Sequence, residues 1–302
     1  MLERSPLLPA IAAVAAAVLG GSAVVATRFA VPESDALSLA IVRHAGAGLI
    51  MALVAATQRR QRFARPDLVI IIGLGMLQFG LFGWCFAAAL KYVPAARGAL
   101  VLSTMPVLTL AIAVIAGRER PTLAKVAGAT IAALGVFVAL GERAAAVGPD
   151  VWKGDLLMFA AALLGSLYNV LSSLSLKRYR ALAVIAVQIP SGTAALIVAL
   201  ALGGDFSHLV AFSAEGWVAV VYLMTIAGAF CFYLWIWALE HTAPSRVAIA
   251  VTANPVAAAI LGALILAEPV TWRIFAGLTG VIAGIVLVNW PSRMGQPSPA
   301  RP

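Results

Sequence analysis

Charged residues are scarce in this chain of 302 residues, and the scarcity decides its class. Only 11% of the residues are Asp, Glu, Lys or Arg, whereas 63% are hydrophobic, and the mean hydropathy is +1.01. A soluble domain has about a quarter of its residues charged and about half of them apolar. The composition therefore excludes a water-soluble fold.

Acidic side chains are missing from the middle of every long apolar run. A carboxylate inside the membrane is the usual proton carrier and the usual anchor for a cationic drug. The first run, AIAAVAAAVLGGSAVVAT, contains no glutamate. This absence argues against a proton-coupled exporter of cationic drugs and favours passive flux.

Sequence signals for enzymatic chemistry are lacking as well. The chain contains no GxxxxGK[ST] phosphate loop, so we do not expect ATP hydrolysis. Its two cysteines, Cys85 and Cys231, lie in apolar runs without metal-ligand spacing, which argues against a disulfide framework. The sequence also shows no His/Asp/Glu metal cluster and no paired-carboxylate site. We therefore expect no catalytic residue, no metal and no cofactor.

Ten apolar runs follow one another along the chain, and each is long enough to cross a hydrocarbon core of about 30 Å. Spanning segments must satisfy their own backbone hydrogen bonds, and these runs lack the period-two alternation of a membrane barrel. The predicted fold is therefore all-α, an integral membrane protein with ten transmembrane helices. The runs cover residues 7–28, 35–57, 67–90, 95–116, 122–140, 155–176, 182–202, 216–239, 245–266 and 272–290.

Basic side chains cluster in alternate connections between the runs. They follow the second, fourth and sixth runs, for example at Arg62, Arg120 and Lys177, whereas connections one, three, seven and nine are poor in them. By the positive-inside rule we expect both termini to be cytoplasmic. The net charge of +9 thus encodes orientation. The expected partners are a lipid bilayer and a small solute, and no nucleic acid.

An internal repeat relates the two halves of the chain at an offset of 149 residues. Phe86–Leu140 aligns without a gap on Trp235–Asn289, so that Arg97 falls on Arg246, Pro106 on Pro255 and Glu119 on Glu268. Five runs per half is an odd number, so the second half enters the membrane upside down. Two inverted halves supply the symmetric gates that alternating access needs.

The repeat also predicts the domain organisation. The predicted domains are a first five-helix repeat at 1–140, a connecting loop at 141–154, a second five-helix repeat at 155–290 and a disordered cytoplasmic tail at 291–302. The tail is polar and rich in proline, which is typical of disorder. Neither repeat is expected to stand alone, because each leaves half of a shared cavity unmade.

The two aligned halves resemble a known family. VLSTMPVLTLAIAVIAGRERPTLAKVAGATIAALGVFV and AVTANPVAAAILGALILAEPVTWRIFAGLTGVIAGIVLV are similar to the paired EamA domains of the drug/metabolite transporter superfamily. LAIVRHAGAGLIMAL resembles the family's second helix, which often carries an arginine at the place of Arg43. The resemblance covers nearly the whole chain. It implies a ten-helix inverted repeat with a central cavity in the bacterial inner membrane, as in exporters of amino acids, including aromatic ones.

Arg43 and His44 are the most unusual polar residues of the second run, about a third of the way into it. A charge at such a depth normally faces a cavity or a partner. Arg43 either binds a solute carboxylate with its planar guanidinium or ties down helix ends and snorkels to the interface. His44 is either a satisfied core histidine or a proton relay.

Polar and aromatic side chains inside other runs complete the predicted substrate-binding set. The polar members either join helices or contact a solute, and the aromatic members either line a wall for an apolar solute side chain or pack in the core or interfacial belt. The polar members are Gln78, Tyr168, Asn169, Gln188 and Asn254. The aromatic members are Trp84, Tyr233 and Trp237.

Proline and glycine mark two further features. Pro106 and Pro255 occupy equivalent positions of the repeat and act either as hinges or as static kinks. Gly280 and Gly284 form a GxxxG pair, which permits close helix contact within a monomer or in a homodimer.

These features together predict a secondary transporter. It exports small metabolites, with amino acids of apolar or aromatic side chain favoured, by alternating access around a central cavity. The direction of transport follows from the family resemblance alone. A multidrug, sugar or other metabolite transporter of the same superfamily is the alternative, and a non-transporting membrane scaffold is the alternative from another class.

Overall fold

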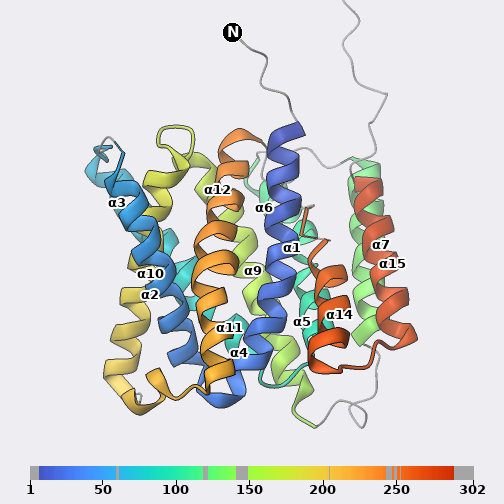
Figure 1. Ribbon diagram of the computed structural model, residues 1–302. Helices are drawn as coiled ribbons and strands as arrows, with labels where there is room; N and C mark the ends of the chain where they lie inside the picture. The colour runs from blue at the N-terminus through green and yellow to red at the C-terminus, as the bar shows by residue number, and fades with distance from the viewer. Residues whose placement is uncertain are drawn as a thin grey trace, which may run out of the picture.

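The apolar runs form helices, because a backbone inside a membrane has no water to bond and must satisfy its own N–H and C=O groups. The computed structural model describes residues 7–58, 61–117, 122–140, 149–203, 205–242, 247, 250–251 and 253–288, and these contain helices and turns but no strand. Arg246 and Glu119 of the repeat, residues 141–148 of the connecting loop and the tail at 291–302 lie outside the described residues. The helices stand side by side in one bundle (Figure 1).

The helices of the first half lie at α1 (Leu7–Ala30), α2 (Ala36–Ala56), α3 (Arg65–Gly75), η2 (Met76–Phe82), α4 (Gly83–Ala89), α5 (Ala95–Leu102), α6 (Met105–Ile115) and α7 (Leu123–Leu140). Those of the second half lie at α9 (Val151–Ser175), α10 (Ala181–Gly203), α11 (Ala214–Met224), η4 (Thr225–Phe230), α12 (Cys231–His241), α14 (Ala253–Leu266) and α15 (Trp272–Val288). Short 3-10 turns lie at η1 (Val31–Glu33) and η3 (Phe206–Val210).

Seven helical stretches of the described chain are long and apolar enough to cross a membrane, so the protein is a multi-pass membrane protein. They are Leu8–Glu33, Ala36–Ala56, Arg65–Ala89, Ala95–Ile115, Val151–Ser175, Ala181–Gly203 and Ala214–His241. The apolar helices Ala253–Leu266 and Trp272–Gly284 are shorter. The total of ten spans remains a prediction.

Two of the long stretches are interrupted by π-helical turns, which the sequence did not predict. In the first half, η2 begins at Met76, and in the second half, η4 begins at Thr225. The separation is 225 − 76 = 149 residues, which is the offset of the sequence repeat. A π-turn accommodates one extra residue and is often found at functional sites.

Helices of one half pack mainly on helices of the other half. In the described chain α1 packs along α14 and α12, and α9 packs along α4, α5 and α6. Likewise α2 packs against α10, α11 and η4. The α10 helix also packs against α3 and η2. The largest buried apolar cluster accordingly draws residues from both halves, including Phe79 and Ile236. Each half therefore depends on the other for its core.

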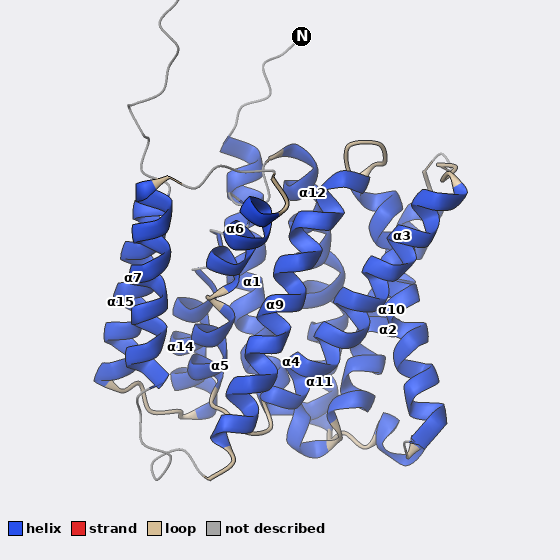
Figure 2. Cartoon of the chain, turned by 180° about the vertical axis from the view of Figure 1, so that it is seen from behind, coloured by secondary structure: helices blue, strands red, loops and turns tan. Residues whose placement is uncertain are grey.

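The α7 and α15 helices form a pair at one side of the bundle (Figures 1 and 2). Glycine makes their close contact possible: a Cβ on Gly280 would lie 2.9 Å from Gly135 Cα, and one on Gly284 would collide with the Gly128 carbonyl oxygen. The GxxxG pair of α15 therefore packs against α7 within one chain.

The repeated prolines lie at helix starts. Pro106 lies in the first turn of α6, directly after a turn at Ser103 and Thr104 that separates α5 from α6. Pro255 lies in the first turn of α14. Proline suits a first turn because the N–H that it lacks has no partner inside the helix there. Both prolines thus lie at the start of a helix, and their action as hinges or as static kinks stays a prediction.

Candidate solute-binding cavity

A cavity lies between the two halves, where α1, α2, η2 and α4–α6 face α9, η4, α12 and α14. Its volume is about 90 Å³, whereas a cavity that holds a single water needs about 10–15 Å³. The helices α7, α10 and α15 contribute no lining residue. The cavity therefore has room for a small solute inside the membrane-spanning part of the bundle.

The lining follows the sequence repeat. Six pairs of lining residues are separated by 149 positions: Gly20 and Asn169, Gln78 and Ala227, Phe82 and Cys231, Phe86 and Trp235, Leu102 and Val251, and Met105 and Asn254. Equivalent positions of the two halves thus face the same space, although their side chains differ in size and polarity.

Aromatic and aliphatic groups form most of the cavity wall. Phe82 and Phe86 stack with their ring centroids 5.9 Å apart, and Phe232 and Met105 also contribute to the wall. The exposed surface of the cavity is mostly apolar. Such a wall suits the apolar portion of a solute.

Arg43 on α2 brings a positive charge to this wall. The residue is 7% exposed, and its guanidinium donates one hydrogen bond, from Nη1 to Thr27 Oγ1 at 3.3 Å. The guanidinium carbon lies 5.5 Å from the Phe86 ring centroid and 5.9 Å from that of Phe232. No ion pair involves Arg43 in the described chain, and its Nε has no hydrogen-bond partner there. Within the described part of the chain, aromatic faces and one hydroxyl therefore stabilise the charge.

Three amide side chains from three helices share the cavity with Arg43. They are Gln78 on η2, Asn169 on α9 and Asn254 on α14, and each has one buried polar atom without a partner among the described residues: Gln78 Oε1, Asn169 Nδ2 and Asn254 Oδ1. Asn169 Oδ1 accepts a hydrogen bond of 3.1 Å from Trp235 Nε1. Most buried polar atoms have partners, so three residues with an unpartnered atom around one cavity point to a ligand.

Three other predicted site residues are buried beside the cavity without lining it. The Tyr168 hydroxyl donates to Gln188 Oε1 at 2.8 Å, and Gln188 Nε2 donates to Ser172 Oγ at 3.4 Å, which joins α9 to α10. His44 packs edge-on against Phe79, with ring centroids 5.7 Å apart. Tyr168 and Gln188 thus join two helices, whereas His44 packs in the core with its Nδ1 unpartnered among the described residues.

The predicted aromatic residues also lie elsewhere. Trp84 is 38% exposed on the outer surface. Tyr233 and Trp237 line a separate hollow near the end of α12, together with Arg180 and Glu240. The cavity wall uses Phe86 and Trp235 instead. Trp235 was not predicted, although the repeat offset from Phe86 was a signal that pointed to it.

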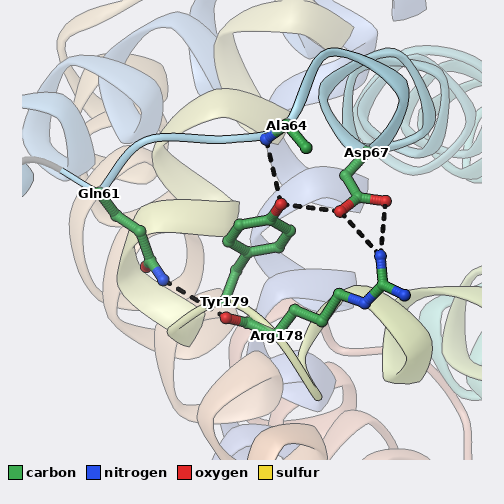
Figure 3. A network of polar contacts seen from close by, with 5 residues as sticks. All are labelled: Gln61, Ala64, Asp67, Arg178 and Tyr179. Atoms are coloured by element: carbon green, nitrogen blue, oxygen red, sulfur yellow. Dashed lines mark hydrogen bonds and ion pairs between the residues drawn. The ribbon is translucent and has the colours of Figure 1, made fainter.

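Polar contacts join the two halves at both ends of the bundle. Where α3 begins, Tyr179 Oη accepts from Ala64 N at 3.1 Å and donates to Asp67 Oδ2 at 2.7 Å (Figure 3). Arg178 completes this network with an ion pair of 3.2 Å to Asp67.

At the opposite end Glu268 lies between α1 and the start of α5. Its Oε2 accepts from Ala95 N at 2.9 Å, and its Oε1 lies 3.5 Å from Arg28 Nε. Contacts between the halves at two levels, with a cavity between them, are the arrangement that a two-gated transporter requires.

A profile of the EamA-like transporter family matches residues 7–141 and 152–290. The chain belongs to the EamA-like transporter family. It is therefore a transporter and not an enzyme, and the resemblance of its two halves to EamA domains is confirmed.

Individual relatives agree with this assignment. An uncharacterized transporter of Archaeoglobus fulgidus is 26% identical over 273 residues, which cover 89% of this chain and 94% of that protein. The aromatic amino acid exporter YddG of Ancylobacter novellus is 37% identical over 112 residues, which cover 36% of this chain and 38% of that protein. A protein of known crystal structure superposes on this chain with a TM-score of 0.71 at 22% sequence identity. The superposition covers 93% of this chain and 96% of that protein, so the two share a fold.

Proposed function

We propose that this transporter exports a small solute with a carboxylate across the bacterial inner membrane, and that an amino acid with an apolar or aromatic side chain is the preferred solute. The observation that carries the proposal is Arg43, a buried guanidinium that lines the central cavity without a carboxylate partner among the described residues. The planar guanidinium matches a carboxylate with two parallel hydrogen bonds.

The cost of the buried charge supports this role. A charged side chain near the membrane centre costs about 2.5–3.5 kcal/mol on insertion scales. Ion pairs with protein carboxylates normally offset such a cost, but the partners of Arg43 among the described residues are Thr27 and two aromatic rings. A solute carboxylate would supply an ion-pair partner for this guanidinium, which lines the cavity.

The cavity wall supports an apolar or aromatic solute side chain. Phe82, Phe86 and Phe232 present ring surfaces beside the guanidinium. The relative named as an aromatic amino acid exporter aligns with about a third of this chain. Both observations favour phenylalanine and similar amino acids over sugars.

The mechanism that we propose is alternating access between two inverted five-helix repeats, with ten spans and both termini in the cytoplasm. The six lining pairs at an offset of 149 and the equivalent π-turns of η2 and η4 support an internal two-fold relation. The helix breaks at Pro106 and Pro255 are the proposed hinges. Flux follows the solute gradient, because the acidic residues of the sequence lie at the ends of the apolar runs.

Transport by purified protein in liposomes tests the proposal. We expect efflux of labelled phenylalanine at a rate independent of a pH gradient, and little efflux of threonine or of a lipophilic cation. Gradient-driven flux of the cation alone would overturn the proposal in favour of a multidrug transporter. The absence of flux for every solute would favour a scaffold.

Cys231 provides a reporter of cavity occupancy in the same protein. Cys231 lines the cavity, whereas Cys85 does not, so a Cys85→Ala variant carries its one cysteine at the site. We expect phenylalanine to slow the reaction of Cys231 with a small thiol reagent. Equal rates with and without phenylalanine would contradict binding in this cavity.

A further inference from the structure

We infer that the cavity recognises both ends of a zwitterion through a donor side and an acceptor side, and that Trp235 is the positioning residue that fixes the donor side. This inference rests on the proposed transport of amino acids. It adds a site for the α-ammonium group and an order of preference among solutes that share the same carboxylate and the same ring.

The orientation of the Asn169 amide is the first step of the argument. An indole N–H is a donor only, so the Asn169 atom that meets Trp235 Nε1 at 3.1 Å must be the carbonyl oxygen. The amide nitrogen then points elsewhere. It is Asn169 Nδ2, a donor that is buried and without a partner in the described chain. Trp235 thereby leaves the Asn169 amide nitrogen as a donor for another partner.

The donor side follows from this orientation. Arg43 Nε is a second buried donor without a partner at the same cavity. Two donors, one of them charged, bind a carboxylate, and a charge-assisted hydrogen bond is about twice as strong as a neutral one. The donor side therefore holds the carboxylate end of the solute.

The acceptor side consists of Gln78 Oε1 and Asn254 Oδ1. Both atoms are buried, and neither has a donor among the described residues. Asn254 is held against α1, because a Cβ on Gly20 would lie only 2.9 Å from Asn254 Nδ2, and this contact directs the nitrogen toward α1. An ammonium group has three donors and no acceptor, so it satisfies these two oxygens.

The two sides together predict selectivity for zwitterions. A solute that lacks the ammonium group leaves two buried oxygens unpartnered, and a site built to hydrogen-bond a group rejects the analogue that lacks it. We expect 3-phenylpropionate to bind about 10- to 100-fold more weakly than phenylalanine, and 2-phenylethylamine to bind more weakly still, because it leaves Arg43 unpartnered.

Competition against labelled phenylalanine on the purified full chain tests the inference. Gln78→Met and Asn254→Leu keep side-chain size and remove the acceptors, so we expect a 10- to 100-fold loss for phenylalanine and little change for 3-phenylpropionate. Trp235→Phe keeps a ring and frees the Asn169 amide, so we expect both ligands to weaken by about 3- to 10-fold. Trp237→Phe, on the same helix but outside the cavity, is the matched control.

Each outcome bears on a distinct claim. Equal affinity of the wild type for phenylalanine and 3-phenylpropionate would overturn the inference and leave the carboxylate proposal standing. Equal losses for both ligands in the Gln78 and Asn254 variants, or a Trp235→Phe variant that matches Trp237→Phe, would also overturn it. Failure of the wild type to bind any of the three ligands would overturn the proposed function itself.

Discussion

Two clusters of buried polar side chains lie side by side in this membrane bundle, and they differ in one respect. In the cavity cluster, Arg43, Gln78, Asn169 and Asn254 each keep an atom without a partner in the described chain. In the α9–α10 cluster, Tyr168, Gln188 and Ser172 bond to one another. Both clusters consist of residues inside apolar runs, so the sequence alone gives them the same interpretation.

The difference separates binding from helix joining. Hydrogen bonds among Tyr168, Gln188 and Ser172 replace those lost on leaving water, so this cluster stabilises the contact between α9 and α10. The cavity cluster retains unmet bonding capacity, which costs stability and is available to a solute. Variants of the two clusters are therefore expected to have opposite effects on transport and on stability.

The largest effect is expected for Arg43→Met. Phenylalanine flux should fall about 100-fold, because the charged partner of the carboxylate is lost. The melting temperature should stay the same or rise, because a buried charge without an ion pair is replaced by an apolar side chain. Flux in liposomes and thermal unfolding in one detergent measure the two effects.

Arg43→Lys is the control for charge. It keeps the positive charge and loses the planar fork, so we expect intermediate flux. Retained flux together with a lower melting temperature in Arg43→Met would assign Arg43 to the structural cluster and break the comparison.

The opposite pattern is expected for Gln188→Leu. The Tyr168 hydroxyl loses its acceptor in a buried position, so the free energy of unfolding should fall by about 1–3 kcal/mol. Affinity for phenylalanine should stay the same, because Gln188 does not line the cavity. Thermal unfolding and ligand competition check the two parts.

A second substitution sharpens this prediction. Adding Tyr168→Phe to Gln188→Leu removes the unpartnered hydroxyl, so part of the lost stability should return. A double variant that is less stable by the sum of the two single losses would show that the two side chains act independently.

The smallest effect is expected for a polar group that is satisfied at a helix end. Asp35 caps α2 by accepting from Leu37 N at 2.8 Å and Ser38 N at 3.0 Å. Partial burial raises the pKa of this carboxyl, but the hydrogen bonds from Ser38 and Leu37 and the charge of Lys91 outweigh it and lower the pKa. Asp35→Ala should cost about 1 kcal/mol of stability.

The lowered pKa gives this cap a defined pH dependence. The folded protein binds the Asp35 proton less readily than the unfolded chain, whose pKa is about 3.9. The stabilisation is therefore complete well above pH 4 and disappears as the pH falls through the lower folded-state pKa. Asp35→Asn keeps a capping side chain without the charge, so its stability should lack this dependence; an unchanged acid profile would contradict the assignment.

Much of the fold could be predicted from the sequence. Apolar runs of this length form helices in a membrane, because spanning segments must satisfy their own backbone hydrogen bonds. The offset of 149 residues relates Gln78 to Ala227 and Phe86 to Trp235, and both pairs line one cavity. The offset also relates the π-turns, although helical periodicity gave no sign of them. Propensity does not reveal a π-turn, because one added residue leaves the surrounding composition unchanged.

The partners of polar side chains were decided by the tertiary structure. Gln188 and Gln78 look alike in sequence, but Gln188 accepts a hydrogen bond from Tyr168, whereas Gln78 lines the cavity and has an oxygen without a partner among the described residues. The aromatic positions show the same limit, since Trp84 faces outward while Phe86, two residues later, faces the cavity. Lipid and an apolar cavity wall favour the same side chains, so in a membrane protein the face of a helix that binds solute is set by what packs beside it.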